Sequence, residues 1–156
     1  MAEDHYLYAS SEDCKDLYPD NRPQRFTVQL PRELNLSGTW YCALKELYFK
    51  GEFRFNPKGL LHVPKKAPQY LYLCTDVIEG AHLSNSYVPV LRRSEVKKKL
   101  ERVYAEPHYF RVIVPRVTEL TVYVLDQDLK PVVFKKSPLT CLFHFTRRCP
   151  SGPNTS

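Results

Sequence analysis

The sequence has no long hydrophobic segment, because no apolar run approaches the ~18 residues that a helix needs to cross a bilayer. The first residues are acidic and lack an apolar core, so we expect no secretory signal. The five cysteines include no CxxC pair, and an odd number without a signal predicts reduced thiols in the cytosol or nucleus. These absences argue against a membrane protein and against a secreted disulfide scaffold.

Motifs for catalysis and cofactor binding are also missing. The five glycines are scattered, so neither GxGxxG nor GK[ST] occurs, and GxSxG and HExxH are absent. Cys141 and His144 are close in sequence, but in a strand they would point to opposite faces, which disfavours zinc. His144 is then expected to be an outward sheet residue or one whose hydrogen bonds are satisfied within the sheet. Asp126 and Asp128 fit a hairpin turn better than a calcium loop. We therefore expect no enzyme, no catalytic residue, no metal and no cofactor.

What the chain does contain is a series of short alternating segments separated by prolines and turns. With 156 residues, 43% of them hydrophobic and 13% aromatic, it is long enough for one domain with one core. In the segment 40–49 the apolar face continues only after a one-residue slip at Lys45-Glu46, which is typical of a β-bulge. The predicted core residues are Phe26, Val28, Leu30, Trp40, Leu44, Leu120, Val122, Val124, Leu139, Phe143 and Phe145.

One segment departs from strand periodicity. Val96, Leu100 and Val103 fall at i, i+4 and i+7, which predicts a single helix near residues 94–104. The predicted fold class is therefore all-β, a single jelly-roll β-sandwich of about eight strands with one short helix. The expected divisions are an extended N-terminal arm at 1–22, a jelly-roll domain at 23–148 and a disordered tail at 149–156.

Charge is distributed unevenly along the chain, whose formal net charge is +6. Residues 1–20 contain six acids and one lysine, whereas residues 92–102 contain six bases and two acids. The basic residues predict contact with nucleic acid or an acidic partner, and the alternative is a solvated face. This basic patch comprises Arg92, Arg93, Lys97, Lys98, Lys99 and Arg102. The arm is expected to dock through the anchors Tyr6, Leu7, Tyr8 and Tyr18, and the alternative is a frayed terminus.

An ordered set of motifs adds a resemblance to this pattern. The sequence begins with "FTVQLPRELNLSGTW", continues with "YLYLCTDVIEG" and "YVPVLRR", and closes with "TVYVLDQDLKPVVFKKSPLTCLFHFTRR". Over residues 25–147 this order resembles the penton-like minor capsid proteins of Polinton-type elements and of the related adenovirus-like adintoviruses and adomaviruses. The chain lacks the long insertion and the Arg-Gly-Asp triplet of larger adenovirus pentons, so an integrin-binding role is not implied.

The resemblance implies a viral structural protein. Five copies of a jelly roll would form each vertex of the capsid of a DNA virus, and the N-terminal arm would reach the major capsid protein. The protein would then be found in the virion, and in the host nucleus or cytoplasm during assembly. A host receptor and viral DNA are further candidate partners. Two other functions stay open: a soluble receptor- or glycan-binding jelly-roll module, and a basic nucleic-acid-binding protein.

Overall fold

The computed structural model describes residues 4–49, 69–83, 85–95, 100–132 and 138–147, and these residues form strands but no helix. No helix that could cross a membrane is therefore found in these ranges. The eleven strands are β1 (Asp4–Ser10), β2 (Arg25–Asn35), β3 (Tyr41–Phe49), β4 (Tyr70–Thr75), β5 (Ala81–Leu83), β6 (Ser86–Val88), β7 (Val90–Glu95), β8 (Leu100–Val103), β9 (Phe110–Arg111), β10 (Arg116–Asp126) and β11 (Leu139–Thr146). The all-β prediction is confirmed, with more strands than expected.

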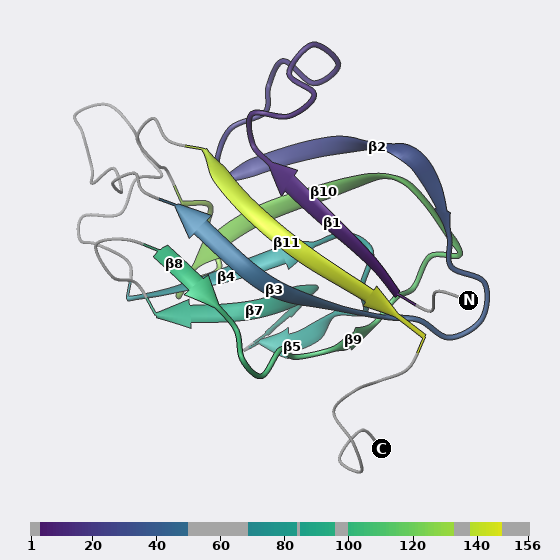
Figure 1. Cartoon of the computed structure of the whole chain (residues 1–156). Helices are drawn as coiled ribbons and strands as arrows, with labels where there is room; N and C mark the ends of the chain where they lie inside the picture. Colours follow the sequence, from purple (N-terminus) through teal and green to yellow (C-terminus); the bar gives the residue numbers. More distant parts are fainter. Residues whose placement is uncertain (1–3, 50–68, 84, 96–99, 133–137, 148–156) are drawn as a thin grey trace.

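The strands form two main antiparallel sheets that face each other as layers (Figure 1). Sheet A has the order β1-β11-β3-β8, with β9 also paired to β3, and sheet B has the order β2-β10-β4-β7. The strands β5 and β6 form a separate two-stranded hairpin. Thus β1 pairs with β11 and β2 pairs with β10. This nested order is compatible with a jelly roll.

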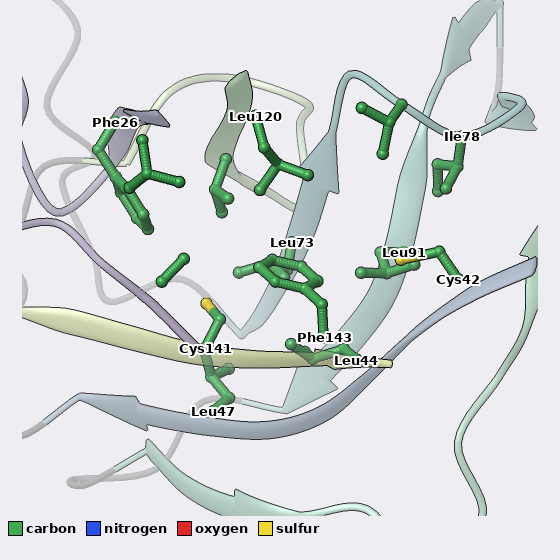
Figure 2. Close-up of a cluster of buried hydrophobic side chains, with 14 of the residues drawn as sticks. Phe26, Cys42, Leu44, Leu47, Leu73, Ile78, Leu91, Leu120, Cys141 and Phe143 are labelled. Atoms are coloured by element: carbon green, nitrogen blue, oxygen red, sulfur yellow. The ribbon is translucent and has the colours of Figure 1, made fainter. Parts of the chain in front are cut away.

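The core lies between the two sheets, and its side chains come mainly from the inward faces of β2, β3, β4, β10 and β11. All of the predicted core residues are buried. Phe26 and Leu120 of sheet B and Leu44 and Phe143 of sheet A project into the space between the layers (Figure 2). Since burial of one such side chain contributes roughly 1.5–3 kcal/mol, this layer is the main source of stability.

The predicted β-bulge in β3 is confirmed. Glu46 pairs with Leu142 and Leu44 pairs with Phe143, so Lys45 has no opposite residue in β11. The extra residue changes the alternation, and for that reason Leu47 is buried although it stands an odd number of positions after Leu44. The slip keeps the apolar side of both halves of β3 on the core.

The predicted helix near residues 94–104 is wrong. Ser94 belongs to β7 and residues 100–103 form β8, while residues 96–99 lie outside the described residues. Val103, which the helix would have buried, is 70% exposed. A helix of about eleven residues is marginal alone, whereas β3 and β4 each offer a free strand edge to pair with. The ladder hydrogen bonds of the two sheets therefore outweigh the local helical spacing.

The separate N-terminal arm is also wrong for the residues that the structure describes. Asp4–Ser10 pairs with β11 along its whole length, from Asp4 opposite Thr146 to Ser10 opposite Thr140. The segment is extended as predicted, but it is a strand of sheet A and hence part of the domain. Its free-standing appearance in the sequence arises because its partner strand lies at the other end of the chain. The predicted tail at 149–156 lies outside the described residues.

The turn predicted at Asp126 and Asp128 closes the hairpin after β10. The Asp126 side chain accepts hydrogen bonds from the backbone N–H groups of Asp128 and Lys130, at 2.8 and 3.1 Å. Leu129 in the same turn has a φ of 60°, in the left-handed region. The carboxylate of Asp126 thus stabilises the backbone of the turn, as the sequence predicted.

Replacing Trp40 by alanine tests the core register. Trp40 is 5% exposed, its indole N–H donates to the Ser37 carbonyl at 3.0 Å, and its ring stacks on His5. We expect Trp40→Ala to lower the free energy of unfolding by about 3–5 kcal/mol, measured by urea titration. Ile113→Ala, at a 59% exposed position outside the two main sheets, is the control, with an effect within about 0.5 kcal/mol. Equal effects of the two substitutions would contradict the assigned faces.

Deleting residues 1–10 tests whether β1 is part of the domain. The deletion removes the strand that pairs with β11, including the buried Ala9, and exposes the edge of β11. We therefore expect a lower urea midpoint and faster amide exchange in β11. An arm that lies outside the fold would be dispensable, and an unchanged midpoint would show that β1 contributes nothing to the sandwich.

Candidate interaction surfaces

The described members of the predicted basic patch lie on edge strands and not on a helix. Arg92 and Arg93 belong to β7, the edge strand of sheet B, and Arg102 belongs to β8, the edge strand of sheet A. The remaining members, Lys97, Lys98 and Lys99, lie outside the described residues. The structure thus brings three of the six basic residues to the side of the sandwich where β7 and β8 end the two sheets.

Two of these arginines lie flat against tyrosine rings. The Arg92 guanidinium is 4.2 Å from the centroid of the Tyr104 ring and donates to the backbone oxygen of Glu106 at 2.9 Å. The Arg93 guanidinium is 4.5 Å from the centroid of Tyr70. Cation–π contacts at exposed sites are worth about 0.5–1 kcal/mol each, so the rings hold the two charges along the surface. This aromatic pairing was not evident from the sequence, because Tyr70 is distant from the arginines along the chain.

A hydrogen bond joins the edges of the two sheets beneath these arginines. The hydroxyl of Ser94, on β7, is bonded to the hydroxyl of Tyr104, which directly follows β8. Burial raises the pKa of Tyr104, and the hydrogen bond with Ser94 acts in the opposite direction. The tyrosine therefore stays neutral at physiological pH and serves as a fixed support for Arg92.

The predicted anchors of the arm contact their own chain. Tyr6 and Tyr8 stand on the outer face of sheet A and are 60% and 64% exposed, whereas Leu7 packs toward the core. Tyr18 donates a hydrogen bond to the carboxylate of Glu119 on β10, and this bond raises the pKa of Tyr18. Only Tyr6 and Tyr8 are thus exposed enough to be available to a partner.

His144 forms a cluster with Asp4, Tyr6 and Tyr109 on the outer face of sheet A. Its Nε2 is 2.8 Å from Asp4 Oδ1, its Nδ1 is 2.9 Å from the Tyr109 hydroxyl, and the Tyr6 ring stacks on it at 4.6 Å. With the proton on Nε2, the imidazole donates to Asp4 and accepts from Tyr109. The prediction of an outward histidine is confirmed, and its neighbours leave it buried.

The same cluster determines the charge state of Asp4. Hydrogen bonds from the side chains of His144 and, secondarily, Thr146 lower the pKa of the Asp4 carboxyl below its ordinary value. Both partners lie on β11, while Asp4 begins β1. The carboxylate therefore fastens the start of the N-terminal strand to the central strand of sheet A.

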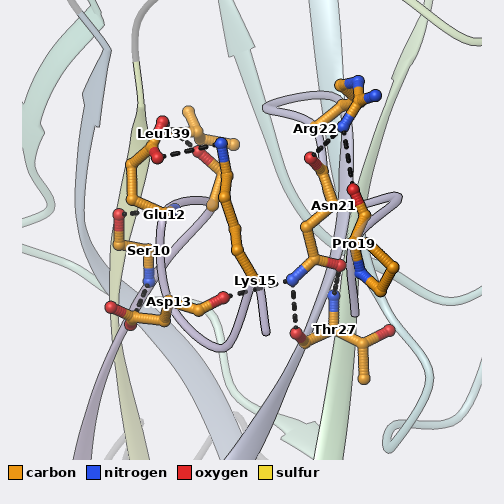
Figure 3. A network of polar contacts seen from close by, with 10 residues as sticks. Ser10, Glu12, Asp13, Lys15, Pro19, Asn21, Arg22, Thr27 and Leu139 are labelled. Atoms are coloured by element: carbon orange, nitrogen blue, oxygen red, sulfur yellow. Dashed lines mark hydrogen bonds and ion pairs between the residues drawn. The ribbon is translucent and has the colours of Figure 1, made fainter. Parts of the chain in front are cut away.

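The loop between β1 and β2 is held by its own polar contacts (Figure 3). Asp13 accepts a hydrogen bond from the backbone N–H of Ser10 at 2.9 Å. The buried Asn21 bonds both the backbone N–H and the backbone carbonyl of Thr27, at 2.9 and 2.8 Å. These bonds fix the acidic segment of the sequence beside the edge formed by β1 and β2.

The acids of this loop differ in their pairing. Glu12 forms an exposed ion pair with Lys15 at 2.9 Å. Asp16 and Asp20 are exposed, and neither has an ion-pair partner in the part of the chain that the structure describes. The loop therefore presents uncompensated negative charge, on the side of the sandwich opposite to Arg92 and Arg93 in the strand order.

A cleft of about 500 Å³ lies at one end of sheet B. Its lining includes Arg25, Asp76, Glu79, Tyr87 and Tyr123. Partial desolvation raises the pKa of Asp76, whose Oδ1 accepts the Thr121 N–H at 3.1 Å, and the Arg25 guanidinium is 5.1 Å from the Tyr123 ring. Charges of both signs line the cleft, and they favour no single class of ligand.

Groups of metal-ligating side chains are absent from the described residues. Cys141 faces the core and His144 the outer face, as expected for neighbours of opposite parity on β11. Burial raises the pKa of Cys42 and Cys141 well above the ordinary value, and that of Cys74 to about 12. These thiols are thus protonated at neutral pH and are poor nucleophiles.

Comparison with known proteins adds no family assignment: no protein-family model matches the chain, and no curated protein matches it. The surfaces described above therefore have to be interpreted from their own geometry.

Replacing Asp4 tests the fastening of β1. Because the folded pKa of Asp4 lies below its ordinary value of 3.8, its stabilising contribution is present above that pH and is lost as the pH falls through the folded pKa. We expect Asp4→Asn to lower the urea midpoint at pH 7 and to differ less from wild type at about pH 2.5. Asp20→Asn is the control for removal of an exposed carboxylate. A difference that grows on acidification would contradict the assignment.

Proposed function

We propose that the protein is a viral structural protein, a penton-like minor capsid protein of a DNA virus, five copies of which form a capsid vertex. The observation that carries this proposal is the nested strand order of the two sheets, which supports a jelly-roll winding. A rigid sandwich of this kind suits assembly, since its faces and edges are fixed by one continuous core.

The motifs behind the proposal fall on strands of both sheets. The "FTVQLP" stretch forms the first half of β2, "YLYLCT" is β4, and "LTCLFHFT" is β11. The "VLDQDLKP" stretch is the end of β10 and its turn. The resemblance therefore extends over both sheets, which supports a common fold more than any one motif does.

The expected contact between the N-terminal arm and a major capsid protein needs a different surface. The described residues of the predicted arm are part of the fold, because β1 pairs with β11 and the loop after β1 makes its own hydrogen bonds. A contact with the shell would instead use the exposed faces and edges of the sandwich. Residence in the virion, with assembly in the host nucleus or cytoplasm, follows from the proposed role.

The oligomeric mass of the purified full-length chain tests the proposal. We expect multi-angle light scattering to give a mass of five chains, because vertices of icosahedral capsids have fivefold symmetry. A mass of three chains would favour the receptor- or glycan-binding module, and a chain that stays single at high concentration would contradict the vertex role.

A further inference from the structure

Exposed hydrophobic side chains gather at the two edges of sheet A. Among the described residues, six large hydrophobic side chains are the most exposed, and three of them, Tyr6, Tyr8 and Val103, belong to this sheet. Tyr8 pairs with Leu142, which pairs with Glu46, which pairs with Val103, so Tyr8 and Val103 end the same row on the same face. Tyr6 and Tyr8 are on β1 and Val103 is on β8, the first and last strands of the sheet order (Figure 1).

Among the described residues, β1 has no strand partner on the side away from β11. The backbone N–H of Ser11 donates to the carbonyl of Leu139 in β11. In an antiparallel pair, every second residue directs its backbone N–H and C=O to the partner strand, and the residues between direct theirs to the other side. Ser10 faces away, and its N–H is taken up by Asp13 at 2.9 Å. By the same alternation Tyr6 and Tyr8 direct their backbone N–H and C=O groups to the free edge.

At the opposite edge of sheet A, β8 has no strand partner on the side away from β3 among the described residues. Tyr104 donates its N–H to Lys45 of β3 at 2.9 Å, so Val103, the residue before it, faces away from β3. Exposed strand edges of this kind pair readily with another strand unless proline or charge prevents it. In sheet B, Pro31 on the edge strand β2 lacks a backbone N–H and disfavours pairing there, whereas β8 of sheet A carries one acid and one base, Glu101 and Arg102.

The strand directions match for a second copy of the chain. The pairings β1–β11, β11–β3 and β3–β8 are all antiparallel, so β1 and β8 run in opposite directions. A second copy in the same orientation would therefore bring its β8 antiparallel to β1, the more stable arrangement. It would also bring Val103 to the face that carries Tyr6 and Tyr8.

Charge favours the same junction. The loop that follows β1 carries the exposed Asp16 and Asp20, which form no ion pair with any described residue, whereas β7, beside β8, carries Arg92 and Arg93. The edge strands β1 and β8 are three interstrand spacings apart, about 14 Å. This distance exceeds the screening length of roughly 8 Å at physiological salt, so each side acts as a separate patch. Head-to-tail contact would place the acidic side of one copy next to the basic side of another.

We infer that copies of this chain join edge to edge, with β1 of one copy pairing with β8 of the next and extending sheet A across the junction. This inference rests on the proposed pentamer and names its contact surface. The contact is heterologous, because two different edges meet, and such contacts close into a ring when the rotation per copy divides a full turn.

Two variants that each block one edge test the junction. Tyr8→Pro removes an N–H that points to the free edge of β1, and Val103→Lys places a charge at the edge of β8. Ile113→Lys, at a 59% exposed position outside both edge strands, is the matched control. Circular dichroism and urea unfolding verify the fold of each variant, and Tyr8→Lys replaces the proline variant if that variant does not fold.

Light scattering of the full-length proteins then gives the outcome. We expect five chains for wild type and Ile113→Lys, one chain for each edge variant, and two chains when the two edge variants are mixed, because each retains the edge that the other has lost. Folded edge variants that remain pentameric would overturn the inference and leave the proposed function intact. The wild-type protein could instead form an assembly of another size, with each edge variant monomeric and the mixture of the two edge variants dimeric. That result would support the junction and overturn the vertex role. A monomeric wild type would overturn both.

Discussion

The rest of the structure depends on the pairing of β11 with two strands at once. β1 lies on one side of β11 and β3 on the other, so the strand that comes last in the order holds the first and the third in one sheet. Its inward side chains, among them Phe143 and Phe145, are fully buried and fill the space opposite sheet B. Its outward His144 binds Asp4. Core, sheet and N-terminal strand are thus stabilised through a single element.

Sequence periodicity predicted the features that are determined within a single strand or turn. Alternation in 26–30 and 139–145 identified the buried face of β2 and β11 because a side chain on a pleated strand has only two directions. The slip at Lys45 was predictable for the same reason, since a bulge shows up as a change of parity within one segment. The Asp126 turn likewise uses hydrogen bonds between near neighbours. Each of these features is determined over a few residues.

Features that need a distant partner could not be predicted in the same way. Asp4–Ser10 looks like a free arm because its pairing strand lies more than a hundred residues later, and residues 94–104 look helical because spacing ignores the edges that β3 and β4 offer. The Arg93–Tyr70 contact and the His144 cluster are of the same kind. Charge, in contrast, was informative: the acidic loop after β1 and the described basic residues of β7 and β8 lie on opposite sides of the sandwich.

The central position of β11 also governs how the molecule is made. During synthesis the ribosome releases β1, β2 and β3 long before the strand that separates β1 from β3 exists. Until β11 is made, β1 and β3 have no strand to pair with between them, and their apolar faces stay exposed to water or to chaperones. Closing contacts across nearly the whole chain is slow compared with local pairing, because the entropy of a large loop must be lost first. Sheet A therefore completes only after translation of its last strand, as a late and cooperative step.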